Sequence, residues 1–74
     1  MYEQFVNLLV DELQIEESDI TLDAELSNDL GINSIGLYDL ITICEENFGL
    51  QIDEDNVRQF TTVGDIVNYL ESLN

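Results

Sequence analysis

The sequence predicts an all-α fold: a small four-helix bundle of three main helices and one short helix, with a long first loop. Three stretches of the chain repeat apolar residues at the spacing of one helix face. Strand signals are weak, since only Leu50-Gln51-Ile52 alternates between apolar and polar residues. Seventy-four residues are too few for two cores, so we expect residues 1–74 to form a single domain.

The first helix is predicted over residues 2–13, where one stripe carries Phe5, Val6, Leu9 and Leu13. Residues 15–33 follow as a long connection between helices. Apolar side chains recur along this connection, so we expect it to pack against the bundle. These side chains are Ile20, Leu22, Leu26 and Leu30.

The second main helix is predicted over residues 34–48, and Gly49 supplies its C-terminal stop. Its inward apolar positions are Leu37, Leu40, Ile41, Cys44 and Phe48. The third begins at Thr62, which is placed to form a capping box with Asp65. Its apolar positions are Val63, Ile66, Val67, Leu70 and Leu73. The short helix is expected within residues 53–59, where acidic residues at its start suit the helix dipole.

The charge of the chain is extreme, with 17 acidic residues against a single basic residue and a net charge of −16. Repulsion from phosphates excludes nucleic acid and anionic membrane surfaces as partners. The charge indicates either a partner protein with a basic patch, found by electrostatic steering, or a surface that only keeps a small protein soluble. We expect a monomer in which Arg58, the one basic residue, pairs locally with a carboxylate.

The cysteine and histidine content excludes several kinds of site. Cys44 is the only cysteine, so it cannot form an internal disulfide, and its place in the apolar stripe predicts a core residue. The chain has no histidine for a zinc site, and Asp53-Glu54-Asp55 lacks the spacing of a calcium loop, so no metal site is expected. Without a signal peptide or a transmembrane run, the expected location is the cytoplasm.

Ser34 lies where an acidic loop turns into the second main helix. The chain has neither histidine nor lysine to activate its hydroxyl, so the protein is not expected to be an enzyme. Two interpretations stay open from position alone. Ser34 or its neighbour Asn33 caps the helix, or Ser34 carries a phosphate-linked group, which a helix N-terminus would stabilise.

The predicted outward stripe of this helix reads Ile35, Asp39, Thr42 and Glu46. One exposed apolar residue beside Ser34, followed by acidic and polar residues, forms a plausible docking strip for a partner protein. Asp29 and Glu45 widen the acidic surface on either side of it.

Five motifs occur in an order that identifies a family resemblance. Asp29-Leu30-Gly31-Ile32-Asn33-Ser34-Ile35 is followed by Asp39-Leu40-Ile41 and Glu45-Glu46-Asn47-Phe48-Gly49. Ile52-Asp53-Glu54-Asp55 then precedes the short helix, and Phe60-Thr61-Thr62-Val63-Gly64-Asp65-Ile66-Val67 enters the last one. Together they resemble the acyl carrier protein family over about residues 2–73.

The resemblance implies that a phosphopantetheinyl transferase attaches 4′-phosphopantetheine covalently to Ser34. The thiol of that arm would hold acyl groups as thioesters, for enzymes of fatty acid synthesis or a related specialised acyl pathway. Acyl-transferring and acyl-processing enzymes with basic patches are then the implied partners. The implied contact residues are Asp29, Asn33, Ile35, Asp39, Glu45 and Glu46. Two alternatives remain: an aminoacyl or D-alanyl carrier, and an acidic helical adaptor without a prosthetic group.

The sequence departs from the family at two positions next to the serine. Asn33 stands where an aspartate is usual, which keeps the capping chemistry but removes a charge that a transferase could pair with. Gly36 replaces an acidic or bulkier residue and costs roughly 1 kcal/mol of helix stability relative to alanine. Which transferase loads the chain, and with what cargo, therefore stays open.

Overall fold

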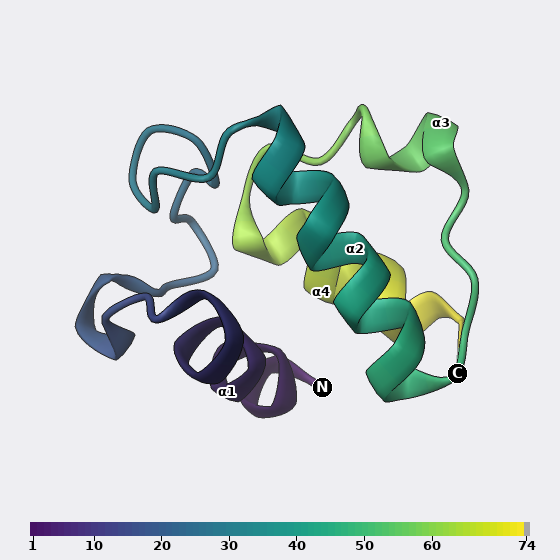
Figure 1. The fold of residues 1–74 in the computed structure, drawn as a ribbon, viewed down its shortest axis with the longest axis horizontal. Helices are drawn as coiled ribbons and strands as arrows, with labels where there is room; N and C mark the ends of the chain where they lie inside the picture. Colours follow the sequence, from purple (N-terminus) through teal and green to yellow (C-terminus); the bar gives the residue numbers. More distant parts are fainter. Residues whose placement is uncertain (74) are drawn as a thin grey trace.

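The computed structural model describes residues 1–73, and it confirms the all-α prediction. The main helices are α1 (Tyr2–Leu13), α2 (Ser34–Phe48) and α4 (Val63–Ser72), and the short helix is α3 (Glu54–Val57) (Figure 1). A single 3₁₀ turn, Glu17–Asp19, interrupts the first loop. Within residues 1–73 there is no β-strand, and none of the helices is long and apolar enough to cross a membrane.

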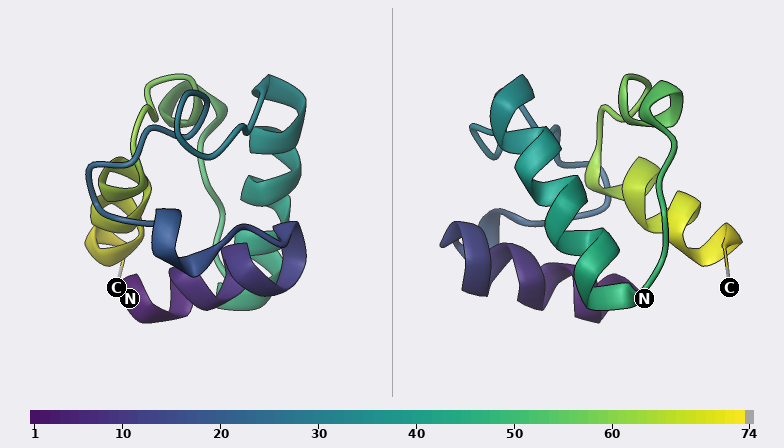
Figure 2. Two further views of the ribbon diagram at one scale, coloured as in Figure 1. Left: turned by 90° about the vertical axis from the view of Figure 1, so that its left-hand side faces the viewer. Right: turned by 45° about the vertical axis from the view of Figure 1, so that its right-hand side comes forward.

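The three main helices surround one core. In the left view of Figure 2, α2 and α4 stand on opposite sides and α1 passes beneath them. The centre is filled by residues with no exposed surface: Phe5 and Leu9 from α1, Leu40 and Cys44 from α2, and Val63, Ile66 and Leu70 from α4. Each of these residues was placed on an apolar stripe by its spacing in the sequence. The helical periodicity therefore located the centre of the core correctly.

Capping residues determine where α2 ends and where α4 begins. The α2 helix ends at Gly49, whose φ of 65° is a left-handed conformation that glycine adopts without strain. At the start of α4, the Thr62 side chain accepts a hydrogen bond from the Asp65 amide, and the Asp65 carboxylate accepts one from the Thr62 amide. The capping box is thus confirmed. The α3 helix has four residues and lies within the predicted range.

The first loop packs against the bundle through its backbone as well as its side chains. Three backbone hydrogen bonds fasten it to the entry of α4, joining Leu26 to Thr61 (2.9 Å), Ala24 to Val63 (3.0 Å) and Leu22 to Gly64 (2.9 Å). Ile20 and Leu26 are buried as expected.

Two of the expected core positions are wrong. Leu22 is 53% exposed, and its link to α4 is made by its backbone carbonyl, which accepts from the Gly64 amide. Leu73 follows the last residue of α4 and is 44% exposed, so it does not extend that helix's apolar stripe.

Candidate functional site at the start of α2

Asn33, not Ser34, is the cap of α2. Its backbone is extended, with φ −81° and ψ −179°, and its side-chain Oδ1 accepts a hydrogen bond of 2.8 Å from the Gly36 amide. Ser34 is the first helical residue and is exposed. The structure thereby settles which of the two residues caps the helix, and it leaves the serine hydroxyl outside the cap.

The loop before α2 is a compact turn that holds the serine in place. The Ile32 amide donates to the Leu26 carbonyl at 2.8 Å, so the residue two before Ser34 is tied to the segment that is itself fastened to α4. Gly31 has a φ of 69°, a left-handed conformation in which a side chain would be strained. Asp29 closes the same turn, since its Oδ2 accepts from the Glu25 amide at 2.7 Å.

A shallow groove of about 220 Å³ lies beside Ser34. Its lining combines polar groups with an apolar wall from the end of the first loop, the first turns of α2 and the residues that follow α3. The polar members are Ser27, Asn33, Ser34 and Thr61, and the apolar members are Leu26, Ile32, Leu37 and Phe60. The Phe60 ring packs edge-on against Tyr69 at a centroid distance of 5.5 Å, which links this wall to α4.

The exposed face of α2 continues from the serine. Ile35 is 75% exposed, and the side chains of Asp39, Thr42 and Glu46 are exposed below it, as the helical spacing predicted. Tyr38 is also exposed, at 40%, and adds an aromatic surface one helical turn from Ile35. The apolar part of this face therefore extends beyond Ile35.

The first turn of α2 carries no acidic residue, although the chain as a whole has a net charge of −16. The positive end of the helix dipole therefore meets no carboxylate within that turn. Because backbone N–H groups and a positive dipole favour anions, this is a place where the chain can accept a phosphodiester despite its overall charge.

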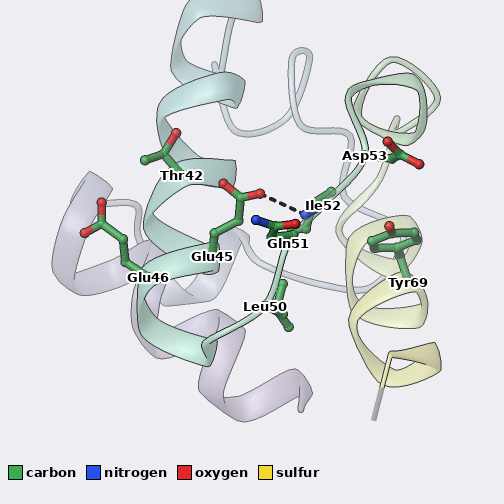
Figure 3. A pocket seen from close by; sticks show the side chains of 8 residues that line it. All are labelled: Thr42, Glu45, Glu46, Leu50, Gln51, Ile52, Asp53 and Tyr69. Atoms are coloured by element: carbon green, nitrogen blue, oxygen red, sulfur yellow. Dashed lines mark hydrogen bonds between the residues drawn. The ribbon is translucent and has the colours of Figure 1, made fainter.

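Glu45 lies apart from the exposed acidic face. It is half-buried, and its Oε2 accepts a hydrogen bond of 2.8 Å from the Ile52 amide in the segment before α3 (Figure 3). The structure brings Asn33, Ser34 and Ile35 together, with Asp39 farther along the helix, but it turns Glu45 toward another element. Sequence spacing gives no signal for this contact, because it joins a helix to an irregular segment.

Cys44 and Arg58 are two further residues that the sequence singled out. Cys44 is fully buried, which confirms it as a core residue, and this burial raises the pKa of its thiol to about 12. Arg58 pairs with Glu54 at 3.5 Å, and both side chains are exposed, so the pair contributes little to stability. No group of acidic, cysteine or histidine side chains among residues 1–73 is arranged to hold a metal ion.

A family model described as "Phosphopantetheine attachment site" matches residues 3–70. The chain therefore belongs to this family of carrier domains. It is a carrier protein with covalently attached 4′-phosphopantetheine, and such domains are carriers rather than catalysts. The exposed serine and the acid-free first turn of α2 fit this prosthetic group. An acidic adaptor without a prosthetic group is thereby excluded.

Proposed function

We propose that Ser34 is the attachment residue and that the protein carries acyl groups as thioesters between enzymes of fatty acid synthesis or a related specialised acyl pathway. The observation that carries the proposal is that α2 is capped by Asn33 and not by Ser34. Asn33 supplies the cap through its bond to Gly36, so the exposed Ser34 hydroxyl is available for modification.

The surroundings of Ser34 favour the phosphodiester link. The amides of the first turn and the helix dipole stabilise a negative phosphate, and the first turn has no carboxylate to repel it. When bound, the arm supplies a terminal thiol that forms thioesters. The protein contributes the anchor, and a flexible tether raises the effective concentration of the cargo at each enzyme that the carrier visits.

Docking is proposed to use the exposed face of α2. Ile35 offers an apolar anchor, while Asp39 and Glu46 provide charges that steer a partner with a basic patch. Asn33, the cap of α2, and Asp29, in the turn before it, complete the proposed contact region. The partners would be the phosphopantetheinyl transferase and the acyl-transferring or acyl-processing enzymes.

The uncharged Asn33 is proposed to decide which transferase loads the carrier. Asn33→Asp keeps the side-chain oxygen that accepts from Gly36, and it adds a charge at the favourable end of the helix dipole. We expect this variant to fold at least as stably as the parent and to be loaded faster by a transferase of the fatty acid pathway. Equal loading rates for the parent and Asn33→Asp would show that the transferase does not respond to the charge at position 33.

The cargo is tested with the phosphopantetheine-loaded protein. It is incubated separately with acyl carrier synthetases plus fatty acids and with amino-acid ligases plus D-alanine or other amino acids, and its intact mass is measured. The proposal predicts a mass increase with the fatty acids. An increase only with an amino acid would instead identify an aminoacyl or D-alanyl carrier. The monomeric state and the cytoplasmic location, where a thiol such as Cys44 stays reduced, are part of the same proposal.

A further inference from the structure

The adjacent acidic residues Glu45 and Glu46 lie in different environments. Glu46 is exposed, whereas Glu45 is half-buried and its carboxylate accepts a hydrogen bond of 2.8 Å from the buried residue Ile52. Figure 3 shows the Glu45 side chain reaching from α2 toward the segment 50–53, with Glu46 directed to the other side. Two neighbouring carboxylates of one helix thus face different parts of the molecule.

Glu45 accepts hydrogen bonds from three backbone amides of the turn that follows α2. Its backbone carbonyl accepts from the amides of Gly49 (3.0 Å) and Leu50 (3.2 Å), and its carboxylate accepts from that of Ile52. A hydrogen bond to a charged acceptor is stronger than one between neutral groups, and a buried amide that loses its acceptor is costly. The Glu45 side chain therefore restrains the chain just before it enters α3.

The restrained segment leads directly to the groove beside Ser34. Asp53 follows Ile52, and its carbonyl accepts from the Asn56 and Val57 amides at the start of α3. The Val57 carbonyl in turn accepts from the Phe60 amide at 3.2 Å, and the Phe60 side chain forms part of the groove wall. One continuous run of contacts thus connects Glu45 to the surface next to the serine.

We propose that Glu45 is a positioning residue that holds the segment 50–53, and through α3 the Phe60 wall, in place beside Ser34. Its negative charge is then secondary, and its effect on loading is exerted through the loop. The part of the proposal that concerns loading rests on Ser34 being the attachment residue. The part that concerns the loop does not.

The test compares three variants by hydrogen exchange at the Ile52 amide and by the loading rate with a transferase and coenzyme A. Glu45→Ala removes the acceptor, Glu45→Gln keeps a side-chain carbonyl but removes the charge, and Glu46→Gln removes the same charge from the exposed neighbour. We expect Glu45→Ala to speed exchange at Ile52 by about tenfold or more and to slow loading. Glu45→Gln should recover part of the protection at Ile52 and most of the loading rate, because its side-chain carbonyl can still accept from the Ile52 amide, although more weakly than a carboxylate.

The control variant should change the loading rate without changing hydrogen exchange at Ile52. Glu46→Gln leaves exchange at Ile52 unchanged and slows loading, most clearly at low salt. Unchanged exchange in Glu45→Ala would overturn the proposal, as would a Glu45→Gln variant that loads as slowly as Glu46→Gln. If a permissive transferase does not load the parent protein, the assignment of Ser34 fails, and the exchange measurement still decides whether Glu45 holds the loop.

Discussion

The same substitution, glycine to alanine, is expected to have opposite effects at two helical positions. Gly64 lies in the first turn of α4 where the first loop crosses it, and its amide donates to the Leu22 carbonyl at 2.9 Å. A Cβ atom at this position would lie 3.0 Å from that same oxygen. At Gly36, a Cβ atom would lie 3.4 Å from Ile32 Cγ2 and 3.5 Å from Asn33 Oδ1, which are ordinary contacts.

The magnitudes follow from these distances. Alanine favours a helix over glycine by about 0.5–1 kcal/mol, and at position 36 nothing offsets that gain. At position 64 the backbone of the loop has to move away. This costs about 1 kcal/mol for the weakened hydrogen bond and about 1–3 kcal/mol for overpacking. We therefore expect Gly36→Ala to stabilise the protein by up to about 1 kcal/mol, and Gly64→Ala to destabilise it by about 1–3 kcal/mol.

Urea denaturation followed by circular dichroism measures both values, and thermal melting gives a second estimate. For a domain of this size, 1 kcal/mol corresponds to a shift of about 4–8 °C in Tm. A Gly64→Ala variant as stable as the parent would refute the account of how the first loop is fastened to α4. A destabilised Gly36→Ala variant would show that the space next to the Asn33 cap is tighter than the distances indicate.

Three further predictions concern charge, pH and the thiol. Replacing Asp39 and Glu46 together by lysine should slow loading far more than it changes the free energy of unfolding, most strongly at low salt; equal rates would refute the docking face. The amides of Thr61 and Thr62 lower the pKa of Asp65 below its ordinary value of 3.8, so its ionised form stabilises the fold above that pH and the contribution is lost as pH falls through the lowered value. The stability difference between parent and Asp65→Asn should therefore be present at pH 6 and shrink below about pH 4, and a pH-independent difference would contradict this. Cys44, with its pKa of about 12, should react with a thiol reagent at pH 8 only as fast as the protein opens, whereas a rate like that of a free thiol would contradict its burial.

The fold was predictable because local signals agreed with the tertiary structure. The observed bounds of α1 and α2 match the predicted ranges, and the Thr62–Asp65 capping box forms as expected. The first loop was harder to predict, because three hydrogen bonds of its backbone attach it to the entry of α4. Side-chain periodicity carries no information about such bonds, so the sequence could not show that Leu22 contributes its carbonyl while its side chain is exposed.

The candidate site was predictable in position but not in its internal arrangement. The motif around Ser34 located the site, but either Asn33 or Ser34 could cap the helix on propensity alone. Only the geometry assigns the cap to Asn33. The role of Glu45 depends on an irregular segment that returns to α2, and the exposed area of Tyr38 depends on how the neighbouring elements leave it uncovered.

Mass spectrometry of the loaded protein tests the central claim most directly. Parent protein and Ser34→Ala are incubated with a permissive phosphopantetheinyl transferase and coenzyme A, and the intact ions are then fragmented. The account predicts that the parent gains one phosphopantetheine group on a fragment containing Ser34. It also predicts that Ser34→Ala stays at its original mass with unchanged helix content, because Asn33 retains the cap. Addition of the group to the alanine variant, or its location on any other residue, would contradict the account.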